Sequence, residues 1–249
     1  YYYLFLSDLN KKLEQDIEII AHKLEQIRDT YFLQNNLLIS ITAEEEAIKD
    51  TINGLNPFLD AISDKVLPPV ERYFHPKELN EGIIAPIQVQ YCAKGGNFFR
   101  KGYSYSGKLR VLTNILNSDY LYRELREKGG AYGAWSGFTL NGYMYFVSYR
   151  DPNLQRTLEI YDQTSEFLRN FECSKRDMER YIIGDISNLD YPKTPEGKGA
   201  QSDDDYITGF TQEDRQQIRD EVLSTRLEDI RQYADMIEEV MSMNHYCVV

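Results

Sequence analysis

The chain has 249 residues, of which 42% are hydrophobic and 13% aromatic, a globular composition that can fill one large core or two modest ones. Its formal net charge of -12 argues against a nucleic-acid partner and against an anionic membrane surface, because both would repel such a protein on average, although a locally basic groove stays open. The sequence contains no run of about 20 apolar residues, the length that a membrane-spanning helix needs.

The first residues, Tyr1–Asp8, have neither an initiating Met nor the basic, apolar and small-residue order of a signal peptide, so we expect the chain to be a piece excised from a longer protein. The three cysteines, Cys92, Cys173 and Cys247, are odd in number and widely spaced, which favours a reducing compartment over a disulfide framework. We therefore predict a cytoplasmic location, with the mitochondrial matrix or another organelle as the alternative.

The three histidines, His22, His75 and His245, are isolated from one another. No pair has the i, i+4 spacing that would place two imidazoles on one metal ion, and three cysteines alone cannot complete a four-ligand zinc site. The sequence therefore predicts no metal ligand in this chain.

The first 66 residues carry helical and strand patterns in turn. Apolar residues recur at steps of three and four from Leu6 to Ile27, which predicts one long amphipathic helix. The β-branched run over residues 37–42 predicts a short strand buried on both faces, and helical spacing returns over residues 43–63. This helix–strand–helix segment is too small to be a domain by itself.

A linker is expected over residues 67–82, because three prolines fall within Val66–Lys77. The alternation within Ile83–Ala93 then predicts the first strand of the next domain, which we place at residues 83–249. Gly95–Gly96 is expected to open a loop rich in aromatic and basic residues. Such a loop could bind an anion through its glycine amides, but the spacing of a phosphate loop is absent, so a turn that leads into a helix near Ser106 is favoured.

That helix is expected to pause at Asn117–Asp119, where side chains could cap a new start, and to resume as far as Lys128. Arg126 and Lys128 place positive charge in the last turn of this helix, and Gly129 is predicted to be its left-handed C-terminal cap.

A strand follows the corner, because the residues from Ala131 to Phe138 alternate. The alternation places Tyr132 on one face with Ala134, Ser136 and Phe138. Arg126 and Tyr132 would then flank a tight turn and aim a guanidinium and a phenol at one spot. On position alone, however, Arg126 is an ordinary cation of a last helical turn and Tyr132 an ordinary strand aromatic.

The rest of the sequence mixes strands and helices. Asn141–Gly142 is a strong hairpin signal between Ala131–Phe138 and an interior strand at Tyr143–Tyr149. Further elements are helices that begin after Asp151–Asn153, Ser174 and Thr211, a loop over residues 191–205, and a final strand at His245–Val249. This order predicts an α+β fold, a layered sheet with a β-hairpin covered by helices, rather than a doubly wound one.

Two stretches, Leu125–Gly133 and Phe146–Asn153, resemble the last domain of the presequence-protease branch of the pitrilysin-type, inverted-zincin metallopeptidases, and the resemblance runs over nearly the whole chain. It implies a metallopeptidase-like α/β roll for residues 83–249, with residues 1–66 as the tail of a preceding domain of the same kind. The spacing of six residues between Arg126 and Tyr132 is that of this branch.

The resemblance also implies roles for the corner residues. Arg126 and Tyr132 would be catalytic and would reach a zinc ion bound by the N-terminal half of the same polypeptide, while Arg126, Gly129 and Gly130 would contact the substrate. The zinc motif His-x-x-Glu-His is absent from this chain, so the zinc ligands are expected upstream and this piece alone is expected to be inactive.

We therefore expect the C-terminal portion of a zinc metalloendopeptidase that degrades short unstructured peptides in a closed chamber. A catalytically inactive partner half or core subunit of the same fold, with a binding or assembly role, is the alternative, although the presence of both Arg126 and Tyr132 favours the enzyme. A third possibility is a separate peptide-binding module that pairs a peptide with the hairpin edge.

Overall fold

The structure is a computed structural model that describes residues 2–13, 15–71, 73 and 88–249. The chain divides into two compact units, Tyr1–Asn80 with Lys193–Asp204, and Glu81–Pro192 with Asp205–Val249, and each is described by itself. The predicted linker at residues 67–82 lies largely outside the described residues, so its boundaries stay a prediction. No described helix has both the length and the apolar character needed to cross a bilayer.

The first unit is made of short helices that bury little. Its elements are α1 (Tyr2–Lys12), α2 (Ile17–Tyr31), the 3-10 helix η1 (Gln34–Asn36), α3 (Glu45–Gly54), α4 (Asn56–Ala61) and the first part of α9 (Pro195–Thr208). None of α1 to α4 has a buried residue, and apolar side chains such as Leu24 and Ile27 are more than half exposed, at 61% and 51%. Among the described residues of this unit, the apolar side chains of α1 to α4 are therefore not buried in a core, although Leu33, outside these helices, is 2% exposed.

Three expectations for this unit are wrong. The single long helix breaks after Lys12, whose carbonyl accepts the N–H of Asp16 at 2.8 Å; the apolar spacing continues across this turn and so conceals it. Residues 37–42 form no strand, because no strand among the described residues takes up their backbone hydrogen bonds. The predicted helix over residues 43–63 divides into α3 and α4 at Asn56, where Pro57 begins a new helix.

The second unit is organised around a four-stranded sheet of order β2-β3-β1-β4, in which every neighbouring pair is antiparallel. Its strands are β1 (Gln90–Asn97), β2 (Gly133–Phe138), β3 (Tyr143–Asp151) and β4 (Tyr246–Val248). The predicted hairpin is confirmed, with Gly142 at a φ of 85° in its turn. The interior position of β3 and the return of the C-terminal strand are confirmed as well.

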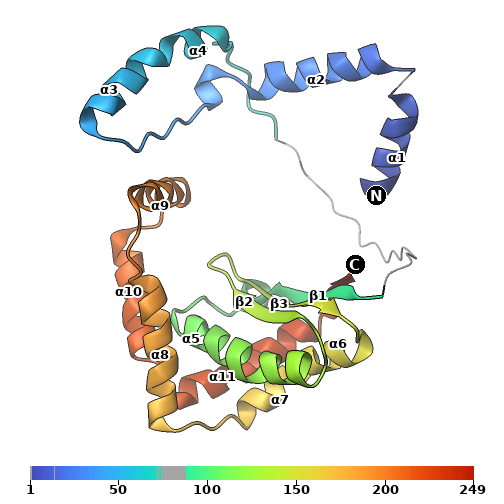
Figure 1. Cartoon of the computed structure of the whole chain (residues 1–249), viewed down its shortest axis with the longest axis vertical. Helices are drawn as coiled ribbons and strands as arrows, with labels where there is room; N and C mark the ends of the chain where they lie inside the picture. Colours follow the sequence, from blue (N-terminus) through green and yellow to red (C-terminus); the bar gives the residue numbers. More distant parts are fainter. Residues whose placement is uncertain (1, 14, 72, 74–87) are drawn as a thin grey trace. The chain divides into compact units, whose positions relative to one another are not determined.

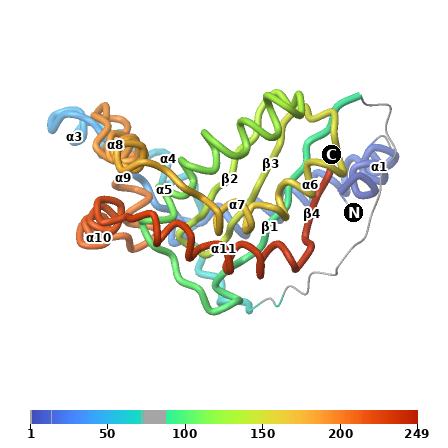
Figure 2. Tube along the Cα trace, turned by 90° about the horizontal axis from the view of Figure 1, so that it is seen from below, coloured from blue at the N-terminus to red at the C-terminus, as the bar shows by residue number. Residues whose placement is uncertain are grey.

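Helices cover one face of this sheet (Figures 1 and 2). The helices of this unit are α5 (Lys108–Ile115), the π-helix η3 (Leu116–Glu127), α6 (Gln155–Asp162), α7 (Thr164–Arg169), α8 (Lys175–Leu189), α10 (Gln212–Leu223) and α11 (Leu227–Met241), and the 3-10 helix η2 (Phe98–Lys101) follows β1. Among them, α7 packs on α11, while α8 and α10 pack on each other and on α5. The α5 and η3 helices pack on β2, and α6 and α11 pack on β1. The layered α+β fold is thereby confirmed.

The core lies between the sheet and these helices. Phe146 of β3, Leu121 of η3 and Ile237 of α11 are fully buried there. Complete burial of such a side chain contributes about 1.5–3 kcal/mol relative to exposure. Among the described residues of this unit, no helix covers the opposite face of the sheet, and Tyr143 and Tyr145 of β3 are about half exposed on it, at 50% and 44%.

Gly95 and Gly96 belong to β1 and not to the predicted loop. A Cβ at Gly95 would lie 2.2 Å from the carbonyl oxygen of Met144 on the neighbouring strand, so the residue is required for the close approach of two backbones and not for a turn. The turn falls later, at Gly102, whose φ is 84°.

The helix does not pause at residues 117–119, and the predicted capping side chains bond elsewhere. The Asn117 side chain accepts the Ser136 N–H at 2.6 Å and donates to the Ser136 carbonyl at 3.3 Å, while Asp119 accepts from the Tyr181 hydroxyl. The predicted loop over residues 191–205 is also wrong from Pro195 onward, where α9 begins and the Thr194 hydroxyl accepts the N–H of Gly197 at 3.1 Å.

Candidate active site

The candidate site is built on the corner where η3 ends and β2 begins. The Gly130 N–H donates to the Arg126 carbonyl at 3.0 Å, and the Ala131 N–H donates to the Leu125 carbonyl at 2.9 Å. With Gly130 at a φ of 79°, these bonds form a left-handed cap. The predicted cap at Gly129 is therefore wrong by one residue. Gly129 is required for space instead, because a Cβ there would lie 2.5 Å from the Leu125 carbonyl oxygen.

The end of β3 holds this corner from the other side. Asn153 Nδ2 donates to the Gly129 carbonyl at 2.6 Å, and the Asn153 N–H donates to Asp151 Oδ1 at 2.8 Å. Asp151 is 1% exposed, and its Oδ2 accepts from the Thr157 hydroxyl at 2.7 Å. The two sequence stretches that carry the resemblance are thus parts of one hydrogen-bonded unit.

Arg126 is exposed in the last turn of η3, where a cation is favoured by the helix dipole. Its Cζ lies 4.9 Å from the ring centre of Tyr122, a cation–π distance. The nearby carboxylate of Glu124 pairs with Lys128 at 2.8 Å and with Arg123 at 3.3 Å. Within the part of the chain that the structure describes, no carboxylate forms an ion pair with Arg126, so its donors are open to a ligand.

Tyr132 precedes β2 and is 65% exposed. Its N–H donates to the Tyr149 carbonyl at 3.0 Å, and its ring meets the Tyr149 ring edge-on at 5.5 Å. The expectation that it shares a face with Ala134 and Ser136 is wrong, because those two residues are buried under the helices. The alternation begins only with Gly133, so the Tyr132 side chain reaches the face without helices.

Arg126 and Tyr132 thus lie on the two sides of a rigid corner. Among the described residues, no hydrogen bond or ring contact joins their side chains, so their convergence on one spot stays a prediction. The backbone between them is nevertheless fixed by the cap and by the bond from Asn153 to Gly129. Both side chains are exposed, and both can meet a ligand that approaches the corner.

Arg150 also belongs to this site, although no pattern in the sequence singles it out. Two residues of β3, Tyr149 and Arg150, lie opposite the single residue Tyr91 of β1, and this mismatch is a β-bulge in β3. Within the bulge, Arg150 has a φ of 47°. Its Cζ lies 5.4 Å from the ring centre of Tyr149 and 5.9 Å from that of Tyr132. A bulge at a residue other than glycine leaves no pattern in one sequence, although Arg150 stands within the stretch that carries the resemblance.

The aromatic side chains of this site interact electrostatically as well as by packing. The rings of Tyr91 and Tyr149 meet edge-on at 5.0 Å. A hydrogen bond with the Tyr149 phenol, and then partial desolvation, raise the pKa of the Tyr91 phenol, while the positive charge of Arg150 acts in the opposite direction. Tyr91, Tyr132, Tyr149 and Arg150 form one cluster, here called the tyrosine cluster.

The described residues of this chain do not fit a zinc site by themselves. Among those that the structure describes, no group of three His, Cys, Asp or Glu side chains is placed to hold a metal ion. Cys92 is buried, Cys173 is half-buried, Cys247 is exposed, and all three are free thiols.

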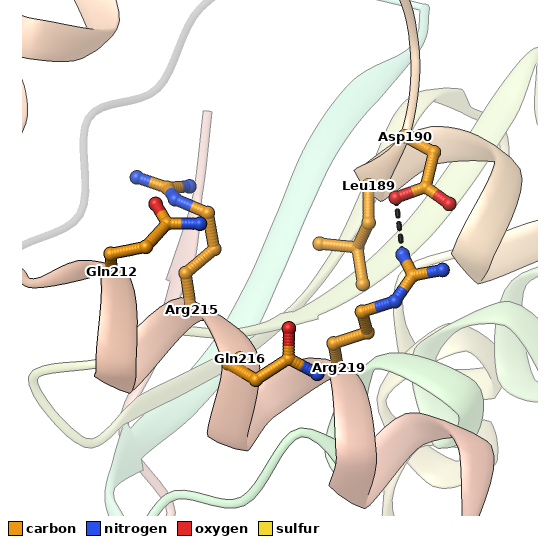
Figure 3. A pocket seen from close by; sticks show the side chains of 6 residues that line it. All are labelled: Leu189, Asp190, Gln212, Arg215, Gln216 and Arg219. Atoms are coloured by element: carbon orange, nitrogen blue, oxygen red, sulfur yellow. Dashed lines mark hydrogen bonds and ion pairs between the residues drawn. The ribbon is translucent and has the colours of Figure 1, made fainter.

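A separate cavity of about 280 Å³ lies between α8 and α10, lined by Leu189, Asp190, Gln212, Arg215, Gln216 and Arg219 (Figure 3). Its two guanidinium groups suggest an anion site. However, Arg219 pairs with Asp190, and Arg215 donates to both oxygens of Asp205 at 2.7 Å. Because each positive charge is already matched by a carboxylate, this cavity is not a candidate for the active site.

Comparison with known proteins is consistent with this geometry. The family model of the PreP C-terminal domain matches residues 80–249. Protein HypA of Clostridium perfringens is 38% identical over 248 residues, which cover 100% of this chain and 25% of that protein. Presequence protease 1, chloroplastic/mitochondrial, of Arabidopsis thaliana is 34% identical over 241 residues, which cover 96% of this chain and 22% of that protein. The chain thus spans about a quarter of the length of these curated relatives.

Two solved structures share the fold. A protease from Helicobacter pylori has a TM-score of 0.56 at 15% identity, covering 83% of this chain and 52% of that one. A peptidase M16 inactive domain from Pseudomonas fluorescens has a TM-score of 0.52 at 16% identity, covering 81% of this chain and 50% of that one. The sheet and the helices on one of its faces therefore share the fold of this class of peptidase domain.

Within that class, the match over residues 80–249 assigns the family. The chain belongs to the PreP C-terminal domain family, and its resemblance to presequence proteases is confirmed.

Proposed function

We propose that this chain is the C-terminal portion of an intracellular zinc metalloendopeptidase that degrades short unstructured peptides inside a closed chamber. Arg126 and Tyr132 are its contribution to the active site. The N-terminal half of the same polypeptide holds the zinc ion, whose role when bound is to polarise the scissile carbonyl.

One observation supports this role most directly: the exposed Arg126 and Tyr132 stand on a backbone corner that is hydrogen-bonded from both sides. Peptide hydrolysis builds negative charge on the former carbonyl oxygen, and a pre-positioned donor that faces this oxygen stabilises the transition state. The Tyr132 phenol supplies one donor, and the Arg126 guanidinium supplies a fork of donors that also suits a substrate carbonyl or carboxylate.

Gly129 and Gly130 complete the proposed substrate contacts. A residue without a side chain lets an extended peptide approach the backbone closely. Gly130 is exposed and Gly129 half-buried, so the corner presents an unobstructed ridge between Arg126 and Tyr132.

The first unit supports the proposed partnership with an N-terminal half. Its helices expose apolar residues that a soluble domain would bury, including Leu24 at 61% and Ile27 at 51%. We attribute these faces to the tail of a preceding domain, residues 1–66, whose body lies outside this chain.

The alternative is a peptide-binding module that pairs a peptide strand with the hairpin edge, and one contact on β2 argues against it. The Asn117 side chain already bonds to both the N–H and the carbonyl of Ser136 on β2, so a peptide strand would have to displace it there. An inactive core subunit stays the main alternative, and kinetics decide between it and the enzyme.

The test is peptide hydrolysis by the full-length protein with Tyr132→Phe, Arg126→Ala and the matched control Tyr143→Phe, which alters another exposed tyrosine of the same sheet. Tyr132→Phe is expected to lower kcat about a hundredfold with little change in KM, since loss of one oxyanion donor costs roughly 3 kcal/mol. Arg126→Ala is expected to lower kcat and raise KM, and Tyr143→Phe to change neither. Full-length protein without activity, or with a Tyr132→Phe turnover within about twofold of the parent, would favour the inactive subunit or a packing role.

A further inference from the structure

The bulge in β3 places the Arg150 side chain on the face of the sheet opposite to the one that strand alternation predicts for it. Met144, Phe146 and Ser148 point into the helical layer and are buried. By alternation Arg150 would follow them. Instead it is exposed, and its guanidinium lies over the rings of Tyr149 and Tyr132. Bulges that re-aim a side chain in this way are concentrated beside active sites.

Arg150 occupies this position at an energetic cost. A φ of 47° is the left-handed region, which disfavours a residue with a Cβ by roughly 1–2 kcal/mol and which glycine occupies freely. The Tyr132 N–H reaches the carbonyls of Tyr149 and Arg150 at 3.0 and 3.4 Å, contacts that glycine at position 150 would also provide. The backbone role therefore does not require arginine, so we attribute the presence of arginine at this position to a function of its guanidinium group.

The guanidinium is oriented but not neutralised. Ring faces of Tyr132 and Tyr149 lie within cation–π distance, at 5.9 and 5.4 Å, and Tyr91 is a further neighbour. In the part of the chain that the structure describes, no Asp or Glu forms an ion pair with Arg150, even though the protein carries 40 acidic residues. The side chain of Asp151 next to it is turned inward, where it bonds to Asn153 and Thr157.

We propose that Arg150 binds a carboxylate of the peptide substrate, and that the tyrosine cluster holds its guanidinium beside Tyr132 for this purpose. Arginine suits the task because its planar fork matches the two oxygens of a carboxylate. The carboxylate is either the C-terminus of the peptide or an Asp or Glu side chain. This inference rests on the proposed peptidase function, and it makes Arg150 a determinant of substrate choice, separate from Arg126 and Tyr132.

The sharpest variant is Arg150→Gly, which removes the guanidinium and suits the backbone conformation. Arg150→Lys keeps the charge without the fork, and Arg176→Ala, at an exposed position of α8, is the control for loss of one positive charge. The full-length protein would be assayed with three versions of one peptide: free C-terminus and internal Glu, the same peptide with a C-terminal amide, and the same peptide with Glu→Gln. Binding of each peptide in the presence of a chelator, measured by calorimetry, gives a readout that does not depend on turnover.

Arg150→Gly is expected to keep or raise Tm and to weaken binding of the parent peptide at least about tenfold, the effect of one charge-assisted pair. It should leave unchanged the binding of whichever peptide lacks the recognised carboxylate, and this peptide identifies the source. Arg150→Lys should recover part of the affinity, and Arg176→Ala should resemble the parent. Equal weakening for all three peptides, or none, would overturn the proposal and instead indicate contact with the N-terminal half or a structural role. Failure of the peptidase function itself would appear separately, as the absence of peptide hydrolysis by the unmutated full-length protein.

Discussion

Asn153 Nδ2 donates to the carbonyl oxygen of Gly129 at 2.6 Å, so the end of β3 fixes the corner between Arg126 and Tyr132. The bond joins residues that are distant in sequence but belong to the two stretches by which the family can be recognised. It gives a physical reason for their occurrence together: one stretch presents the side chains, and the other sets the backbone that carries them.

Removal of this bond should loosen the corner. Asn153→Ala is expected to lower the free energy of unfolding by about 1–2 kcal/mol, because a half-buried carbonyl loses its donor. Asn153→Asp keeps the shape but has no N–H to donate, and should cost at least as much. Urea denaturation of the chain measures both changes. A stable Asn153→Asp variant beside an unstable Asn153→Ala variant would show that packing, and not the hydrogen bond, is responsible.

Gly130 should resist substitution because of its backbone conformation. At a φ of 79°, alanine is expected to cost roughly 1–2 kcal/mol, although its Cβ would meet only Pro152 Cγ, at an ordinary 3.7 Å. Asparagine tolerates left-handed angles and should cost less. Thermal melts of Gly130→Ala and Gly130→Asn test this order, and equal losses would mean that contacts rather than φ decide.

Asp185 in α8 makes a pH-dependent contribution to stability. It is 6% exposed, its Oδ2 has no hydrogen-bond partner, and burial raises its pKa, while Arg110 and Asn114 act in the opposite direction. A raised folded-state pKa means that the unfolded state ionises first as pH rises. Stability from this group is therefore complete below the unfolded pKa of about 4 and is lost as pH rises through the folded pKa.

Asp185→Asn should consequently stabilise the chain at pH 7, by about 1 kcal/mol, and the advantage should vanish below about pH 4, where both states of the parent bind the proton. Urea denaturation between pH 3 and 8 measures the difference. The exposed Asp220→Asn is the control, and a stabilisation that did not change with pH would contradict the assignment to a buried carboxylate.

The isolated chain should neither hold zinc tightly nor hydrolyse peptides, because its described residues offer no cluster of metal ligands. Dialysis against zinc followed by elemental analysis, and incubation with a labelled unstructured peptide, test the two statements. About one zinc per chain that resists mild chelation, or cleavage that survives a chelator and repurification, would refute the division of the active site between two halves.

Elements with a local signal were predictable from the sequence. The Asn141–Gly142 turn, the run of β3 that is apolar on both faces and the capping residues Ser174 and Thr211 each leave a mark within a few residues, and all four are present. The family resemblance added the prediction that Arg126 and Tyr132 act in the active site, whereas their positions alone did not distinguish them from any other cation or aromatic residue.

Features that depend on distant contacts were not predictable. Gly95 is required within β1 because the backbone of Met144 on the neighbouring strand approaches it closely. The Asn117 side chain accepts the N–H of Ser136 and does not cap the start of a helix. The Arg150 bulge exists because two residues of β3 oppose one residue of β1. In each case the deciding partner lies at least 19 residues away along the chain, beyond the reach of any periodicity.

The amide of Asn117 has a consequence for how copies of this protein meet. An uncovered outer strand is a template on which another molecule can add a strand of its own, and repetition of that step builds a fibre. On β2 the bonds to both backbone groups of Ser136 occupy the middle of that template, so a second chain would find its pairing interrupted after a residue or two. One side chain of a neighbouring helix thereby protects the protein against polymerisation along this strand.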